Sequence, residues 1–342
     1  MRQINSKSIT KRFSLFTLFA VIALAGVFFA KTWWATNSAP PLAIKPLYRF
    51  VITKGSSGTL VGNNLYKQGF IKSPLAFKIY IQLNGFSARI QAGEYKLGKN
   101  MSLVAVVNTL LKGSSGIWVT IPEGLRREEI PFRFANALNL GETETKDFVL
   151  EFNQSARNDE GYLFPETYLV QNDLSGAKAY QIMRATFDKQ VDSQLKEDAA
   201  KTNYTLHELI TLASIIERET KSPEERPIVA GIYFNRLQIG MALQADATVQ
   251  YAIGNICYET NSSCNWWKTP TGPDLDINSA YNTYKNAGLP PFPISNPGLT
   301  SIKGVIYPND NNYLYYIHDA KGNIHYAETL EQHNANVVKY LR

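Results

Sequence analysis

The sequence predicts an α+β protein with three parts: a single N-terminal transmembrane helix, a small β-α-α-β-α subdomain and a larger α+β domain. Three observations predict this organisation. A basic N-terminus is followed by an uncharged apolar run, the stretch "SAPPLAIKP" separates this run from the rest, and strand-like and helix-like segments then alternate over about 300 residues.

Residues 13–30 contain no charged side chain, and this length is enough for a membrane-spanning helix. Trp33 and Trp34 follow where an interfacial aromatic belt belongs, and residues 1–12 contain four bases and no acid. The alternative is a cleaved secretory signal, but the run exceeds the typical core of about 7–15 residues and no small-x-small site follows it. We therefore predict a cytoplasmic tail over 1–12, an uncleaved anchor over 13–34 and a linker over 35–46.

The formal net charge is +6, but the first 31 residues hold five bases and no acid, so the remainder carries about +1. No long run of Lys and Arg occurs after the anchor. The basic balance therefore reflects the N-terminus, and we expect no nucleic-acid partner.

The small subdomain is predicted over residues 47–113. It opens with a short apolar strand, and a helix is expected around Leu60–Gln68. Ser73 is placed to cap a second helix, with a proline at its first position. "AGEYKLGKN" then predicts a strand and a turn, before a third helix that Ser102 caps and Gly113 ends.

The larger domain is predicted over residues 117–342, with a strand at Trp118–Ile121. A helix is expected to begin near Arg127, and a final helix to cover Leu330–Tyr340. "NYLYYIHD" and "NIHYAET" predict a hairpin through "AKGN", after a loop-rich stretch. Helical spacing predicts further helices over 143–153, 175–194, 205–220 and 223–237.

Cys257 and Cys264 both lie outside the predicted anchor, in a compartment that favours oxidation. We predict a disulfide between them; the alternative is two free thiols. A zinc site is less favoured, because none of the four histidines stands at ligand spacing to this pair. We expect no metal and no cofactor.

The helix that Thr205 caps becomes apolar or small on every side over Leu209–Ile216, which is typical of a buried helix. Glu217 is the first ionisable group after that run. Burial and the negative end of the helix dipole both raise a carboxyl pKa there. A carboxyl that stays protonated near neutral pH can donate a proton to a glycosidic oxygen. The alternative is a solvated glutamate at a helix end, which is how Glu219 is interpreted.

Several long motifs occur in a fixed order: "VTIPEG", "EGYLFPETY", "ASIIERET", "NRLQIGMALQADATVQYAIG", "AYNTYKNAGLPPFPISNPG" and "HNANVVKYL". In these motifs the chain resembles the MltG (YceG-like) endolytic murein transglycosylases over its whole length, and its small subdomain is similar to a LysM-like module. Two departures occur. Glu166 stands where the family more usually has aspartate, and "CYETNSSCNWWK" is an insert, in which Trp266 and Trp267 are expected to pin a loop rather than contact glycan.

The resemblance implies that Glu217 is the single catalytic glutamate. It would protonate the oxygen between N-acetylmuramic acid and N-acetylglucosamine. It would then take the proton of the muramyl C6 hydroxyl, which attacks C1 and leaves a 1,6-anhydro end. Ordinary glycosidases use two carboxylates. One can suffice when the nucleophile belongs to the substrate.

The matched motifs also hold amides, hydroxyls and tyrosine rings that can bind sugars. Alternatives stay open: Thr248, Tyr251 and Tyr284 can simply pack, and Asp246 can be a turn residue or orient a neighbour. The predicted substrate-binding residues are Gln244, Asp246, Thr248, Tyr251, Tyr281, Asn282, Thr283, Tyr284 and Asn296.

The expected function is endolytic cleavage of nascent peptidoglycan strands, at the periplasmic face of the inner membrane and beside the peptidoglycan synthases of the elongation or division machinery. The LysM-like unit would bind glycan or only position the active site. The alternatives are a hydrolytic muramidase and a non-catalytic wall-binding scaffold.

Overall fold

The computed structural model describes residues 6–43, 45–114, 116–260 and 264–341, with side chains from residue 21 onward apart from residue 260. It has the predicted mixed α+β class, and it divides into two compact units. The small unit holds the chain up to Trp118 together with residues 169–172. The large unit holds residues 119–168 and everything from residue 173.

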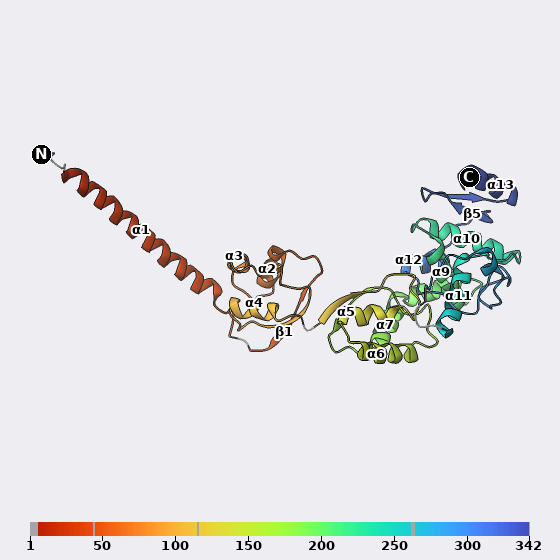
Figure 1. The fold of residues 1–342 in the computed structure, drawn as a ribbon, viewed down its shortest axis with the longest axis horizontal. Helices are drawn as coiled ribbons and strands as arrows, with labels where there is room; N and C mark the ends of the chain where they lie inside the picture. Colours follow the sequence, from red (N-terminus) through yellow and green to blue (C-terminus); the bar gives the residue numbers. More distant parts are fainter. Residues whose placement is uncertain (1–5, 44, 115, 261–263, 342) are drawn as a thin grey trace. The chain divides into compact units, whose positions relative to one another are not determined.

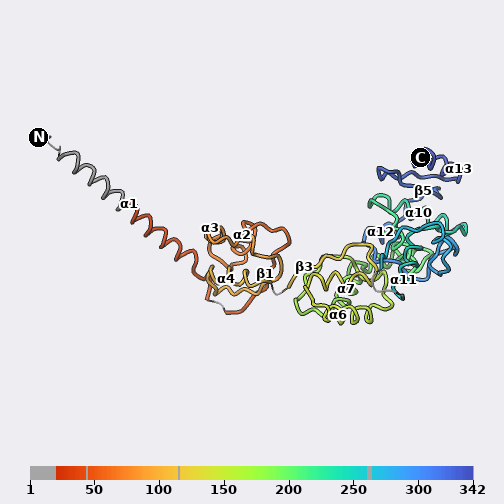
Figure 2. Tube along the Cα trace, viewed as in Figure 1, coloured from red at the N-terminus to blue at the C-terminus, as the bar shows by residue number. Residues whose placement is uncertain are grey.

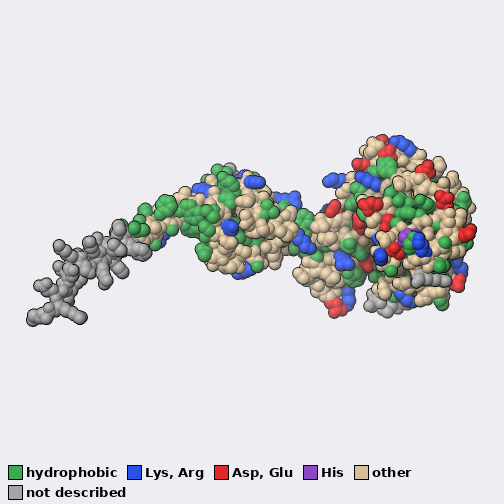
Figure 3. Space-filling view, turned by 90° about the horizontal axis from the view of Figure 1, so that it is seen from above, with side chains coloured by type: hydrophobic (Ala, Val, Ile, Leu, Met, Phe, Trp, Pro, Cys, Tyr) green, Lys and Arg blue, Asp and Glu red, His purple; other side chains and the backbone are tan. Residues whose placement is uncertain are grey.

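The small unit begins with the long helix α1 (Ser6–Ser38), whose side chains from Val21 to Phe29 are largely exposed and apolar. Figure 3 shows them as a green stretch along the described part of the helix. No helix within the described residues is both long and apolar enough to cross a membrane. The predicted tail, and the side chains of residues 13–20 of the predicted anchor, lie outside the described side chains.

Two details of α1 differ from the sequence prediction. The helix continues to Ser38 because no proline interrupts it before Pro40, so the linker begins later than residue 35. Trp33 and Trp34 both pack against the core of the small unit, a contact that the sequence did not predict, and their place at a membrane interface stays a prediction. Trp34 stacks on Tyr80 with ring centroids 5.6 Å apart.

The rest of the small unit has the predicted order of strand, two helices, strand and helix (Figure 1). Ser57, Ser73 and Ser102 each accept the amide of the third residue on, at 3.2 Å, and so begin the three helices. The apolar side chains of these elements form one core. The elements are β1 (Leu47–Ile52), α2 (Gly58–Lys67), α3 (Pro74–Leu83), β2 (Gly93–Gly98) and α4 (Leu103–Leu111).

The four-stranded sheet has the order β1-β2-β3-β4, and the division between the units falls within β3 (Gly116–Thr120) and β4 (Thr167–Gln171). β1 and β2 pair antiparallel, from Leu47 opposite Gly98 to Ile52 opposite Gly93. Gly93 has φ +147°, and a Cβ there would lie 2.3 Å from the Gly116 carbonyl oxygen. Only glycine allows the strands to approach this closely.

The large unit is built around α9, against which α8, α10, α11 and α12 pack. Figure 1 labels α9 near α10, α11 and α12, and Figure 2 traces the backbone of this unit. Every side chain of α9 from Leu209 to Ile216 is buried, as the apolar run predicted. The predicted C-terminal hairpin and final helix are both present. The elements of this unit are α5 (Ile130–Leu138), α6 (Glu142–Ser155), α7 (Gly176–Gln190), α8 (Ser193–Ala200), α9 (Leu206–Glu219), α10 (Glu225–Gln238), α11 (Asp246–Thr260), η1 (Gly272–Asp276), α12 (Leu299–Ile306), β5 (Tyr315–His318), β6 (Ile324–Ala327) and α13 (Leu330–Leu341).

Candidate active site

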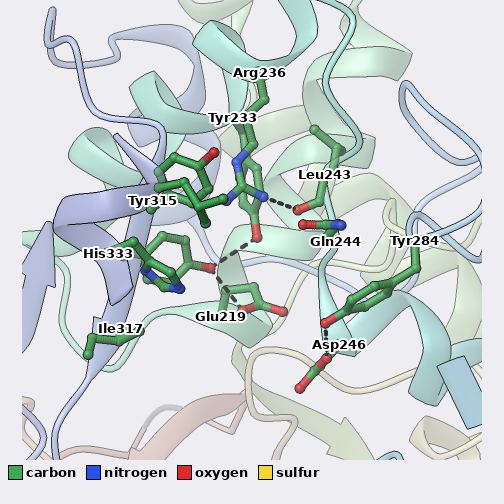
Figure 4. A pocket seen from close by; sticks show the side chains of 12 residues that line it. Glu219, Tyr233, Arg236, Leu243, Gln244, Asp246, Tyr284, Tyr315, Ile317 and His333 are labelled. Atoms are coloured by element: carbon green, nitrogen blue, oxygen red, sulfur yellow. Dashed lines mark hydrogen bonds between the residues drawn. The ribbon is translucent and has the colours of Figure 1, made fainter. Parts of the chain in front are cut away.

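A pocket of about 400 Å³ lies in the large unit, between the body of the unit and the C-terminal hairpin (Figure 4). One wall comes from the end of α9, from α10, and from the segments around Gln244 and Tyr284. The facing wall comes from β5 and α13. Arg236 on α10 ties the two walls together, because its guanidinium donates to the Leu314 carbonyl at 2.7 Å and to the Leu243 carbonyl at 2.6 Å.

Glu219, the last residue of α9, lies in this pocket. Its Oε2 accepts a hydrogen bond from the Tyr316 hydroxyl at 2.9 Å, and the Tyr316 and Tyr233 hydroxyls are 3.0 Å apart. Its Oε1 accepts the Ala247 amide at 3.3 Å, at the start of α11. Burial raises the pKa of Glu219, while the bonds from Tyr316 and Ala247 oppose the rise. A carboxyl with a raised pKa in a pocket can act as a proton donor.

Three predicted substrate-binding residues line the pocket together with Glu219: Gln244, Asp246 and Tyr284 (Figure 4). Asp246 Oδ1 accepts the Tyr284 hydroxyl at 2.6 Å. Gln244 is exposed and has φ +48°, an uncommon value for a residue other than glycine. Its backbone N–H donates to the Thr283 carbonyl at 3.1 Å. A backbone held in a strained conformation at a pocket edge is typical of a binding site.

Glu217, the residue favoured by the sequence, does not line this pocket. It lies two residues before Glu219, about 200° around the helix axis. Its side chain is 5% exposed, and its Oε1 accepts the Arg226 guanidinium at 2.8 Å. Its Oε2 accepts the Gly298 amide at 2.9 Å and the Ser301 hydroxyl at 2.8 Å. The structure therefore places Glu217 in a buried, ion-paired site.

The direction of the pKa shift does not separate the two carboxyls. Burial also raises the pKa of Glu217, against the lowering effects of the Gly298 amide and the Arg226 charge. Both carboxyls are bonded to protein groups on both oxygens, so their position relative to the pocket separates them. Glu219 lines a pocket of about 400 Å³, and Glu217 does not.

Four of the other predicted residues are buried and bonded within the protein. Thr248 and Thr283 share a hydrogen bond of 2.9 Å that ties α11 to the segment carrying Tyr284. Asn282 donates to the Leu275 and Ile277 carbonyls and accepts the Tyr284 amide. The fourth is Asn296. Thr248, Asn282 and Thr283 hold the pocket wall from behind, and contact of all four residues with substrate stays a prediction.

Asn296 belongs to a different cluster. Its Oδ1 accepts two backbone amides, and its Nδ2 donates to Glu160 Oε1 at 2.8 Å. Tyr251 and Tyr281, with ring centroids 4.7 Å apart, line a second pocket of about 130 Å³ beside Glu160 and Arg127. The structure thus does not bring Tyr251, Tyr281 or Asn296 to the pocket of Glu219.

The structure joins Cys257 and Cys264 in a disulfide, with a Cα–Cα distance of 5.8 Å. Trp266 packs over the Arg126 guanidinium at 4.6 Å. Trp267 donates to Glu129 at 2.9 Å and carries the Arg218 guanidinium at 3.7 Å from its ring. Within the described residues, no group of His, Cys, Asp and Glu side chains is placed to hold a metal ion.

Sequence reasoning missed Glu219, and it gave no role to Tyr233, Arg236, Tyr316 or His333. Helical spacing was a signal for Glu219, because it follows buried Ile216 and Ile215 by three and four residues. The same spacing relates Glu217 to buried Ser214 and Ala213, so this signal could not choose between them.

The sequence matches the model of the YceG-like family over residues 50–339. It is similar to a Bacillus subtilis protein named endolytic murein transglycosylase, with 33% identity over 319 residues that cover 85% of this chain and 84% of the relative. A Streptococcus pneumoniae protein of the same name is 29% identical over 361 residues, covering 95% of this chain and 64% of the relative. The crystal structure of a yceG-like protein from Listeria monocytogenes matches with a TM-score of 0.53 at 29% identity, over 85% of this chain and 99% of the other.

Proposed function

Because the chain belongs to the YceG-like family, we propose that it is an endolytic lytic transglycosylase that cleaves peptidoglycan glycan strands. The names of the relatives support the reaction class. One observation carries the proposal at the level of residues: the carboxyl of Glu219 lines a pocket of about 400 Å³, together with Gln244, Asp246 and Tyr284.

In the proposed reaction Glu219 acts first as an acid and then as a base. Its carboxyl gives a proton to the oxygen between N-acetylmuramic acid and N-acetylglucosamine, and the bond from that oxygen to muramyl C1 breaks. The carboxylate then takes the proton of the muramyl C6 hydroxyl as this oxygen bonds to C1. The products are a free 4-hydroxyl and a 1,6-anhydro end, no water is consumed, and Glu219 recovers its proton.

The environment of Glu219 supports both roles. The raised pKa favours the protonated form that the first step needs. The bonds from Tyr316 and Ala247 stabilise the carboxylate that exists between the two steps. The family resemblance assigned these roles to Glu217. That assignment stays a prediction, and access to the pocket favours Glu219.

Two matched variants decide between the glutamates. The full chain, in detergent, is incubated with uncrosslinked glycan strands, and the products are identified by mass spectrometry. We expect Glu219→Gln to fold normally and to form anhydro products at a rate lower by at least about 100-fold, the order of a lost general acid. Glu217→Gln is expected to lower the unfolding temperature, because Arg226 loses its closest carboxylate, and to retain anhydro products when folded.

The reverse pattern, an inactive but stable Glu217→Gln and an active Glu219→Gln, would restore the assignment made from the sequence. Wild-type protein that is folded and binds glycan without cleaving it would favour a wall-binding scaffold.

Hydrolysis is the second candidate, and one observation favours it: a second carboxylate, Asp246, lines the same pocket as Glu219. Most glycoside hydrolases place two catalytic carboxyl groups on either side of the glycosidic bond. The products distinguish the reactions, because hydrolysis gives reducing ends that are heavier by one water. With hydrolysis, Asp246→Asn would abolish cleavage. With the transglycosylase it would weaken cleavage through the Tyr284 contact.

The proposal extends to location. The uncharged run of residues 13–30 and the exposed apolar side chains of α1 support an anchor in the cytoplasmic membrane with the N-terminus inside. The large unit would then work on the outer side, where new strands emerge beside the synthases that make them. The small unit, similar in sequence to LysM-like modules, would either bind glycan or hold the large unit at its distance.

A further inference from the structure

The pocket of Glu219 has two unlike walls (Figure 4). The wall that carries Gln244, Asp246 and Tyr284 presents an amide, a carboxylate and a hydroxyl. The facing wall presents the rings of Tyr315 and His333 and the aliphatic side chains of Ile317 and Leu330. Leu330 is 56% exposed although it is apolar. A ligand that fills this pocket should therefore carry hydroxyls on one side and a small apolar group on the other.

His333 supplies an unused polar atom on the apolar wall. Its Nδ1 is buried and has no hydrogen-bond partner among the residues that the structure describes. The ring stacks on Tyr315, with centroids 5.2 Å apart and planes at 30°. A half-turn of the ring would exchange Nδ1 with a carbon and keep this stacking. A buried nitrogen without a partner is unfavourable. Nδ1 is enclosed as the ring stands, so a ligand in the pocket satisfies it, and gains affinity, once the ring has turned.

The imidazole is neutral at neutral pH. Burial lowers the pKa of His333, and the positive charge of Arg236 lowers it further. A neutral imidazole has one N–H donor and one acceptor nitrogen, and it makes no demand for a charged partner. It therefore suits an amide better than a carboxylate.

We propose that His333, Tyr315, Ile317 and Leu330 form a subsite for the acetamido group of the sugar bound beside Glu219. The acetamido methyl would pack on Ile317 and Leu330, and the amide would hydrogen-bond the imidazole. The hydroxyl-bearing edge of the ring would then face Gln244, Asp246 and Tyr284. This inference rests on the proposed function, since both sugars of peptidoglycan carry an acetamido group, and it makes His333 a determinant of specificity for N-acetylated glycan.

The test removes the imidazole and the acetyl group separately and together. Wild type and His333→Phe, as full-length protein in detergent, are assayed on N-acetylated strands and on the same strands after N-deacetylation. His333→Phe keeps a ring to stack on Tyr315 but has no nitrogen. We expect it to raise KM on acetylated strands by about 2- to 10-fold, the range of one neutral hydrogen bond, with little change in kcat. On deacetylated strands the variant and the wild type should have equal KM.

Two more variants locate the atom. Asn places a polar atom near the position of Nδ1, whereas Gln places one near Nε2. We expect His333→Asn to recover most of the preference for acetylated strands, and His333→Gln to recover little. His325→Phe is the matched control, because His325 lies on the same hairpin but stacks on Tyr340 and bonds Asp319 away from the pocket. Its preference should equal that of wild type.

Some outcomes would overturn the inference and leave the proposed function intact. One is a wild type that makes anhydro products equally well from both substrates. Another is an equal rise in the KM of His333→Phe on acetylated and on deacetylated strands, which would mean that His333 has a structural role. Failure of the wild type to cleave acetylated strands at all would instead overturn the proposed function.

Discussion

Glu160 lines the second pocket of the large unit beside Tyr251, and it is 6% exposed. It accepts the Arg127 amide at 3.1 Å and the Asn296 side chain at 2.8 Å. Burial raises its pKa to about 8, with a further rise from the nearby charge of Glu128. The folded protein therefore keeps a proton on Glu160 at pH values where an unfolded glutamate has lost it.

This retained proton predicts a pH dependence of stability. An unfolded glutamate titrates near pH 4.3, at about its ordinary value. Between that pH and about 8 the unfolded state binds fewer protons than the folded state, so the contribution of Glu160 to stability falls as pH rises. The contribution is complete below about pH 4.3. We expect the free energy of unfolding of wild type, relative to Glu160→Gln, to decrease between pH 5 and 8 in urea titrations.

Glu142→Gln is the control for this measurement, because the side chain of Glu142 is 85% exposed. The free energy of unfolding of Glu142→Gln should change with pH in the same way as that of wild type. If that of Glu160→Gln does so as well, Glu160 is already ionised in the folded protein at pH 5.

At the scale of elements, the backbone amides at the starts of α11 and α12 donate hydrogen bonds to the two glutamates of α9. The Ala247 amide at the start of α11 donates to Glu219, and the Gly298 amide before α12 donates to Glu217. The first backbone amides of a helix usually donate to the side chain of a nearby Ser, Thr, Asp or Asn. Here the acceptors come from another helix, about 30 and 80 residues earlier in the chain.

This explains which helices the sequence could predict. The helices α2, α3, α4 and α9 have local caps from Ser57, Ser73, Ser102 and Thr205, and all four were predicted. The helix α12 has no side-chain cap, and both α11 and α12 fell within a stretch predicted to be loop-rich. β4 was missed because its five residues form a strand only beside β3. The predicted helix over 175–194 is two helices, since Asp192 caps α8.

The disulfide fixes the C-terminal end of α11, which also holds Arg126 through Tyr251 and Asn255. Closing so short a loop stabilises a protein by about 2–3 kcal/mol in the chain-entropy model. We expect the Cys257→Ser, Cys264→Ser double variant to lose about this much stability in urea unfolding. It should retain cleavage, since neither cysteine lines the pocket of Glu219.

A reducing agent provides the check on that prediction. It should lower the stability of wild type to that of the double variant and leave the double variant unchanged. Equal stability of the wild type with and without the reductant, with reduction verified by thiol labelling, would mean that the bond does not stabilise the fold.

At the scale of the whole molecule, each unit has its own core, and α1 adds an apolar surface that neither core covers in its N-terminal part. Leu24 and Phe28 are 70% and 71% exposed. Exposed apolar surface of this extent is unfavourable in water and marks an interaction with a membrane or a protein. We expect the full chain to float with lipid vesicles in a density gradient, and a fragment beginning at residue 36 to stay at the bottom.

The fragment should cleave soluble strands as fast as the full chain in detergent, because Glu219 and its pocket belong to the large unit. Phe28→Arg, which places a charge inside the apolar run, is the matched control and should weaken flotation without changing cleavage. A full chain that remains soluble without vesicles or detergent would contradict the anchor.

The fold class and the order of elements in the small unit could be read from local patterns, because capping and periodicity act over a few residues. The structure divides the chain after Trp118, with residues 169–172 returning to the first unit, and the predicted domain bounds of 47–113 and 117–342 stay a prediction. The pocket could not be read in this way. Its residues run from Glu219 to His333, and only the packing of the hairpin against α10 brings them together.

The paired glutamates of α9 have a consequence for genetics. A screen that scores only cleavage activity in cells would report changes at either position as loss of function, since one change removes a partner of buried Arg226 and the other removes the proposed acid. Loss of activity alone would therefore not tell which of the two glutamates is catalytic. A screen that also records the amount of folded protein would separate them, because only the Glu219 alleles should accumulate to wild-type abundance.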